Sequence, residues 1–309
     1  MMEFDRKFPD EDACENHLFQ LKWPSGFCCS NCGGKKYYKL KGKSLKRRRL
    51  LQCASRDCKK QVSLTGKTMF HGSKIPLQKW YIAIFLMTQT KKGISGVLLS
   101  KQIHVSESTA LLMQYKIRKK MESDMVKYKI GGPDFLVLAE EFKVGGKTSS
   151  NQKVLALLEI QANQKQKRIR LIPIPDKQNT SVELNLIPLI AQGSTLCTNA
   201  KKNYSKISIR NFKQLDYAGV IGRHEICNFQ STRKLEINII NFKKWYLGLH
   251  HFFALTNTGY YCNEFSYRFN RRREETNIFQ KFLRRAAENS NRLKMRDFYQ
   301  KKPYLPLAA

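Results

Sequence analysis

Four cysteines near the start of the chain have the residue type and the spacing to hold a metal ion. They form two close pairs, Cys29-Ser-Asn-Cys32 and Cys53-Ala-Ser-Arg-Asp-Cys58. Zinc takes four thiolates in a tetrahedron, and a short loop inside each pair lets two sulfurs face one metal. The spacing therefore predicts a structural zinc ribbon that binds zinc through Cys29, Cys32, Cys53 and Cys58.

The first cysteine pair can be read in two registers, because Cys28 lies directly before Cys29. With Cys29 the pair encloses the short loop that zinc sites prefer, and Gly33-Gly34 then allows a tight turn. With Cys28 the loop is one residue longer, so we predict that Cys28 is not a ligand. His17 and His71 are possible substitutes, but four thiolates already complete the site.

Basic residues greatly outnumber acidic ones. The chain has 57 Lys and Arg against 24 Asp and Glu, a formal net charge of +33. Part of this excess lies in three runs, Lys46-Arg47-Arg48-Arg49, Arg271-Arg272-Arg273 and Arg284-Arg285. Such clusters raise the local potential and release counterions when they meet phosphates. A zinc module on so basic a chain is typical of a nucleic-acid-binding protein.

The composition argues against several other classes of protein. A hydrophobic content of 41% is enough for a real core, which excludes a disordered basic tail. No run approaches the roughly 20 apolar residues of a membrane span, and the first residues contain no apolar signal region. We expect a protein of the cytoplasm or nucleoid in a prokaryote, or of the nucleus if the host is eukaryotic.

The elements of the first 125 residues can be read from local patterns. Pro9 to Gln20 predicts a helix, and Tyr37 to Leu40 and Arg49 to Gln52 predict the short strands of the ribbon. Leu77 to Thr90 has helical periodicity after Pro76, and a second helix runs over 94–103. Ser106 caps a third helix that extends to about Met121. Two helices joined by a tight turn, the second ending in Lys116, Arg118 and further lysines, resemble a helix-turn-helix.

From residue 134 onward the hydrophobic period changes to that of strands. Three strands are predicted over 135–139, 154–160 and 169–174, followed by a helix over 181–191, a strand over 194–198 and a long helix over 235–248. This order fits an RNase H-like α/β fold. We therefore predict an α/β multidomain chain. Its expected parts are a zinc ribbon with its leading helix (1–72), a helix-turn-helix-like segment (73–125), an RNase H-like core (130–290) and a tail (291–309).

Several blocks of the chain resemble a known family. Besides the ribbon, they are Lys79-Trp80 through Ser95, Leu138 to Lys147, Gly193 to Asn199 with Tyr204, Lys243-Lys244 with His250-His251, and Glu264-Phe-Ser-Tyr-Arg-Phe-Asn-Arg271. They look like the zinc-ribbon insertion-sequence transposases with a DDE-type RNase H-like core, the ISXO-two-like group, which is related to Merlin elements. The resemblance covers nearly the whole chain and implies metal-dependent cleavage and transfer of DNA strands.

The resemblance also implies which residues hold the catalytic Mg²⁺ or Mn²⁺. In such enzymes three side chains bind two divalent metals, and the first two are aspartates. The first aspartate aligns with Glu140, the second with Asn199 and the third acid with Glu236, with Asn241 as runner-up. Glu140 is longer than aspartate and Asn199 is neutral, whereas Mg²⁺ prefers anionic oxygens. We expect a protein of weak or no cleavage activity.

The sequence thus predicts a DNA-binding protein of a transposase family. Its expected partners are double-stranded transposon inverted repeats and further copies of itself on that DNA, and no membrane. The residues expected to contact DNA are Lys46, Arg47, Arg48, Arg49, Ser106, Glu107, Ser108, Thr109, Lys116, Arg118, Arg271 and Arg272. The alternatives are a non-enzymatic DNA-binding protein, either decayed or domesticated, and, ranked last, an RNA-binding factor.

Overall fold

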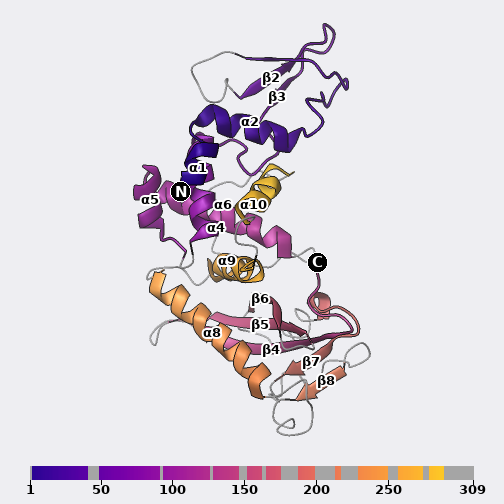
Figure 1. The fold of residues 1–309 in the computed structure, drawn as a ribbon, viewed down its shortest axis with the longest axis vertical. Coiled ribbons are helices and arrows are strands. Elements are labelled where there is room, and N and C mark those ends of the chain that lie inside the picture. Colours follow the sequence, from indigo (N-terminus) through magenta and orange to yellow (C-terminus); the bar gives the residue numbers. More distant parts are fainter. Residues whose placement is uncertain are drawn as a thin grey trace. The chain divides into compact units, whose positions relative to one another are not determined.

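The fold is taken from a computed structural model (Figure 1). It describes residues 2–40, 49–90, 93–125, 128–145, 152–161, 165–174, 187–198, 213–216, 229–249, 257–273 and 278–288. The chain divides into two compact units. The first comprises Met1–Lys120 and Thr276–Phe298, and the second comprises Met121–Glu275 and Tyr299–Ala309. No helix in the described ranges is long and apolar enough to cross a membrane.

The first unit begins with two helices and a small sheet. Helix α1 (Met2–Lys7) precedes α2 (Glu11–Lys22), whose N-cap Asp10 accepts a hydrogen bond from the backbone of Ala13. Strands β1 (Tyr37–Lys39), β2 (Leu50–Cys53) and β3 (Gln61–Ser63) form an antiparallel sheet in that order. The sequence predicted α2, β1 and β2 but not β3.

Three further helices of the first unit lie where periodicity predicted them. They are α4 (Leu77–Gln89), α5 (Gly96–Ile103) and α6 (Glu107–Met125). A fourth, α10 (Ile278–Ala287), packs on α4 and α2 although it is far away in the sequence. Its Phe279 ring contacts the rings of Phe4, Phe8 and Phe85. The predicted core of 130–290 included this segment, which the structure groups with the first unit.

The second unit contains a five-stranded mixed sheet in the order β6-β5-β4-β7-β8 (Figure 1). The strands are β4 (Phe135–Val144), β5 (Gln152–Gln161), β6 (Gln166–Ile174), β7 (Thr195–Thr198) and β8 (Lys213–Asp216). The first three are antiparallel neighbours, and β7 and β8 continue the sheet in parallel with β4. This order and these directions confirm the predicted RNase H-like α/β core.

Alternating residues of the central strands bury two apolar clusters, one on each face of the sheet. Leu136, Leu138 and Phe142 of β4 pack with residues of α8 (Phe229–Leu249), including Phe242. Val137 and Ala139 pack in the cluster on the opposite face. Helix α8 confirms the predicted long helix, and its buried positions recur at helical spacing along one side.

Helix α9 (Thr258–Asn270) covers the outer edge of the sheet. The side chain of Asn270 accepts a hydrogen bond from the backbone N–H of Ile169 at 2.7 Å and donates one to its carbonyl at 3.1 Å. Ser266 accepts from the N–H of Leu171 at 3.1 Å, and Arg272 donates to the carbonyl of Gln166 at 2.7 Å. These bonds occupy backbone groups of β6 that would otherwise invite another strand.

The predicted helix over 181–191 falls largely outside the described residues. Its described part contains a single 3-10 turn, η1 (Ile187–Leu189), followed by a bridge between Ile190 and Ile130. The predicted turn from Asn199 to Tyr204 also lies outside the described ranges.

Candidate metal centre, nucleic-acid interface and catalytic site

The four predicted zinc ligands converge on one point of the ribbon. The sulfur atoms of Cys29, Cys32, Cys53 and Cys58 lie within 4.8 Å of one another. The sulfur of Cys29 lies 3.7 Å from that of Cys58, and the sulfur of Cys32 lies 3.5 Å from that of Cys53, so each of these pairs joins the two knuckles. Four sulfurs bound at about 2.3 Å to a tetrahedral zinc have separations of this order. The cluster fits a structural zinc.

The first knuckle is held by backbone hydrogen bonds and by glycine. The N–H of Gly33 donates to the carbonyl of Cys29 at 2.9 Å, and the N–H of Cys29 donates to Gly34 at 3.0 Å. Gly33 has a φ of +70°, which favours glycine. A Cβ on Gly34 would lie 3.2 Å from the sulfur of Cys32 and 3.3 Å from that of Cys53. Gly33 therefore allows the turn of the knuckle, and Gly34 leaves room for the sulfur atoms of Cys32 and Cys53.

Polar N–H groups around the cluster favour thiolates at two of the ligands. The side-chain amide of Asn31 donates to the sulfur of Cys58 at 3.3 Å, and with the backbone N–H of Lys60 it lowers the pKa of Cys58 to about 6. The backbone N–H groups of Asn31 and Cys32 lower the pKa of Cys29. Zinc binds the thiolate form, so these donors support the site.

The other candidate ligands lie outside the cluster. The Cys28 sulfur is exposed and contacts the Gly33 carbonyl at 3.8 Å, which agrees with the chosen register. The His17 ring is hydrogen-bonded to the hydroxyl of Tyr81 at 3.2 Å. Burial lowers the pKa of His17 to about 4, so this ring is a neutral part of the core. No histidine belongs to the metal-ligand group found among the described residues.

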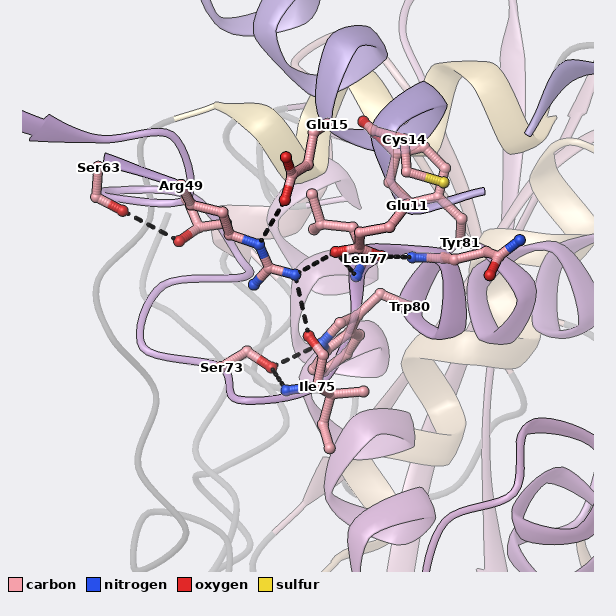
Figure 2. A network of polar contacts seen from close by, with 12 residues as sticks. Glu11, Cys14, Glu15, Arg49, Ser63, Ser73, Ile75, Leu77, Trp80 and Tyr81 are labelled. Atoms are coloured by element: carbon pink, nitrogen blue, oxygen red, sulfur yellow. Dashed lines mark hydrogen bonds and ion pairs between the residues drawn. The ribbon is translucent and has the colours of Figure 1, made fainter. Parts of the chain in front are cut away.

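Arg49 is the one described member of the basic run 46–49, and it points inward (Figure 2). Its side chain is 3% exposed and forms ion pairs with Glu11 and Glu15 of α2. Glu11 also accepts hydrogen bonds from the backbone N–H groups of Leu77, at 2.8 Å, and Gln78, at 2.9 Å, at the start of α4. This network joins the ribbon, α2 and α4.

Helices α5 and α6 are joined by a tight turn. His104 takes a left-handed conformation with a φ of 50°, and the N–H of Val105 donates to the carbonyl of Ser100. Ser106 then caps α6, because its hydroxyl accepts from the N–H of Thr109 at 3.3 Å. A Cβ on Gly96 would lie 2.8 Å from Leu111, so the two helices approach closely. Ser106, Glu107 and Ser108 are exposed, and Thr109 is partly buried.

Several other residues predicted to contact DNA are buried or pack against aromatic rings of the protein. Lys116 and Arg118 are buried, and the Lys116 ammonium lies 5.9 Å from the ring centre of Trp80. Arg272 stacks on Phe269 and bonds to the backbone of β6, while Arg271 stacks on Tyr267 with its guanidinium 4.0 Å from the ring centre. Burial removes Arg49, Lys116 and Arg118 from an exposed interface. Lys46, Arg47 and Arg48 lie outside the described residues.

The predicted catalytic positions fall in the second unit. Glu140 is a partly buried residue of β4, and strand alternation places it on the face of Leu138 and Phe142, which α8 covers. Strands β4 and β7 run parallel, and the last pair in their register is Ala139 with Thr198. Asn199, the next residue after β7, lies outside the described ranges.

Glu236 and Asn241 of α8 are both exposed. Lys243 is the residue by which this helix aligns with the family. Its ammonium lies 5.4 Å from the ring centre of Phe142. Among the residues that the structure describes, the four cysteines are the one group of three or more His, Cys, Asp or Glu side chains placed to share a metal. Glu140 and Glu236 belong to no such group in the described part of the chain.

Two family models match the chain. A transposase zinc-ribbon domain matches residues 9–61, which include all four cysteines and the sheet that carries them. An ISXO2-like transposase domain matches residues 130–270, from β4 to the end of α9. The chain belongs to the zinc-ribbon insertion-sequence transposases. No curated protein matches it.

The two matches confirm the predicted family and assign the two structural modules of this transposase. Helices α4, α5 and α6 lie between the matched ranges, and α10 follows them. The sequence analysis did not predict two sets of contacts that the structure shows. One is the ion pair between Arg49 and α2, and the other is the contact of Asn270 and Ser266 with β6.

Proposed function

We propose that this transposase binds the duplex ends of a mobile element through its first unit. The observation that carries the proposal is the network around Glu11. This carboxylate caps the start of α4 and pairs with Arg49 of the ribbon, so the ribbon and the helices form one unit. A joined unit can place the ribbon and the exposed start of α6 on the same duplex.

The exposed residues of this unit suit two kinds of contact. Ser106, Glu107 and Ser108 are exposed at the N-terminus of α6, where a helix-turn-helix meets base edges. Lys46, Arg47 and Arg48 are proposed to neutralise phosphates, while Arg49 stays in its ion pair. Phosphate contacts position the protein and base contacts give sequence preference.

The test measures binding of the zinc-loaded full chain to duplexes selected from a randomised library. If six phosphates are contacted, log affinity falls by about five for each tenfold rise in salt. Changing Arg47 and Arg48 to Ala lowers affinity for all duplexes and flattens this slope. Changing Glu107 to Ala alters the selected sequence instead. A salt-insensitive affinity, or tighter binding of single-stranded RNA than of any duplex, contradicts the proposal and favours the RNA-binding alternative.

We further propose that this copy of the transposase cleaves DNA weakly with Mg²⁺. Glu140 follows the last residue of the β4–β7 register and lies on the face that α8 covers, and the family resemblance assigns the second ligand to Asn199. The amide of Asn199 brings no negative charge to a site that the family uses for two dications. Glu140 supplies charge, but its extra methylene displaces the carboxylate. The donor set therefore fits a weakened metal site, and a wholly non-enzymatic role is the alternative.

Strand cleavage of an oligonucleotide that carries the selected binding sequence tests this proposal. The Asn199→Asp change restores a negative charge to the site. The Glu140→Asp change restores the shorter side chain that the family uses to hold the metal. The double variant should therefore gain far more activity than either single variant. Glu236→Gln in the double variant abolishes the gain if Glu236 is the third ligand. Robust Mg²⁺-dependent cleavage by the unchanged protein contradicts the proposal. If Asn241→Ala abolishes activity and Glu236→Gln does not, Asn241 is the third metal ligand instead of Glu236.

A further inference from the structure

The ribbon sheet has a solvent-facing side whose residues are unlike those of its inner side. Tyr37 is 38% exposed, but its ring lies against the aromatic rings of Phe19 and Phe27, at centroid distances of 5.4 and 5.0 Å. Strand alternation therefore turns Tyr38 outward, and its side chain is 64% exposed. The ring of Tyr38 is therefore accessible to a ligand on this face of the ribbon.

Tyr38 begins a row that crosses the three strands. The register pairs Tyr38 with Gln52 and Gln52 with Gln61, so the three side chains share the outward face. Gln61 is exposed and Gln52 is partly buried. Within the described part of the chain, neither glutamine side chain makes a hydrogen bond. The row therefore presents one aromatic ring and two amides whose donors and acceptors are available to a ligand.

The charge around this row is strongly positive. The exposed cations of the described ribbon include Lys35, Lys36, Arg56, Lys59 and Lys60, whereas Asp57 is the one exposed acid over 31–40 and 49–67. By alternation Lys36 lies on the same face as Tyr38. Lys39 is turned towards α2 instead, where its ammonium is 3.7 Å from a carboxylate oxygen of Glu15. Such a surround is complementary to a polyanion.

We infer that the outward face of the ribbon sheet, built on Tyr38, Gln52 and Gln61, is a base-reading contact for duplex DNA. The inference rests on the proposed DNA-binding function and adds a site that lies outside α6 and the run 46–49. Adjacent strands are about 4.8 Å apart, so the row spans about 10 Å, or about three base steps of about 3.4 Å. A glutamine amide can pair with both hydrogen-bonding groups of adenine in the major groove, and the tyrosine ring can pack on a thymine methyl group.

Three variants of the full, zinc-loaded chain test this face. Tyr38→Ala and the double change Gln52→Ala with Gln61→Ala remove the ring and the amides. Tyr128→Ala is the matched control, because Tyr128 is 60% exposed but lies in the second unit. Zinc content and the far-ultraviolet circular dichroism of each variant show whether the ribbon remains folded. The probe is the duplex selected by the unchanged protein from a randomised library.

We expect each ribbon variant to lose roughly tenfold in affinity for the selected duplex and to bind random duplexes as before. Its salt dependence stays the same, because no phosphate contact is removed. A new selection with the glutamine variant loses preference at about two adjacent base pairs, because the two glutamines lie on neighbouring strands about 4.8 Å apart. The Tyr128→Ala control changes nothing.

The failures of this inference and of the proposed function are distinct. If the unchanged protein selects no duplex, the proposed function fails. If it selects a duplex and the folded ribbon variants bind that duplex with unchanged affinity and preference, this inference alone is overturned. If Tyr38→Ala weakens binding of a single-stranded oligonucleotide more than binding of the duplex, the face is a stacking platform for single strands and the duplex assignment is wrong.

Discussion

The zinc ribbon has a wholly antiparallel sheet and the second unit has a mixed one, and different forces hold the two sheets together. The apolar cluster of the ribbon contains Phe27, Cys29, Leu51 and Cys53, and two of these four are metal ligands. The mixed sheet instead buries apolar side chains on both faces, under α8 on one of them. The ribbon therefore depends on its metal and its ion pairs, whereas the sheet depends on hydrophobic burial.

The two regions also differ in how their functional residues come together. The zinc ligands lie within one short stretch of sequence, so local turns alone can assemble them. The positions that the family resemblance assigns to catalysis are far apart in the sequence, with Glu140 in β4 and Glu236 in α8, so their arrangement depends on strand register and helix packing. A metal site of the first kind is complete whenever its ribbon folds. A site of the second kind can keep its fold and still lose its chemistry through a single change such as the amide at Asn199.

Removing the metal should separate the two regions most clearly. We expect Cys53→Ser to abolish zinc binding and to unfold the ribbon, because structural zinc contributes about 10 kcal/mol or more to the folding of such modules. The mixed sheet should remain folded. Hydrogen exchange followed by mass spectrometry measures both, with peptides from β2 and β3 losing protection and peptides from β4 and β5 keeping it.

Cys28→Ser is the matched control for that change, since it alters the neighbouring exposed thiol. It should retain one zinc per chain and full protection of the ribbon. Full protection of β2 and β3 in excess chelator, without any metal, would contradict the dependence of the ribbon on zinc.

The buried ion pair gives the next largest expected effect. Arg49→Met removes the cation that faces Glu11 and Glu15 and leaves these carboxylates without it in a buried position. Losing one partner of a buried pair typically costs about 3–5 kcal/mol. We expect α2, β2 and the start of α4 to lose exchange protection together, since the network joins them.

Lys39→Met is the control for Arg49→Met. Lys39 also faces Glu15, at 3.7 Å, but its side chain is 49% exposed, and exposed pairs contribute about 0–1 kcal/mol. If the two variants destabilise the first unit equally, the network in Figure 2 does not join the ribbon to the helices as we describe.

Local patterns in the sequence predicted most elements because their signals are local. Cysteine spacing, the Ser106 cap and the alternation in β4 act within a few residues. Arg49 could not be placed in this way, because a run of four basic residues indicates an exposed surface and its partners lie in another element. The carboxylates of Glu11 and Glu15, one helical turn apart, were the one hint that a cation had to face α2. The grouping of α10 with the first unit depends on the contacts of Phe279, which amphipathic periodicity does not specify.

The smallest of these effects concerns the edge of the mixed sheet. Asn270 bonds to both backbone groups of Ile169, and its loss in Asn270→Ala leaves an N–H and a carbonyl of the edge strand without these partners. The net cost should be about 1–2 kcal/mol, well below that of Arg49→Met, because the buried core of the sheet is untouched. Exchange should increase at β6 and not at β4, and an uncovered edge should also favour self-association at high concentration, which sedimentation velocity detects. Arg273→Ala, at the exposed residue after this contact, is the control and should change neither measurement. Unchanged protection of β6 in Asn270→Ala would show that α9 covers this edge by apolar packing alone. Hydrophobic burial would then stabilise both the interior of the sheet and its edge strand.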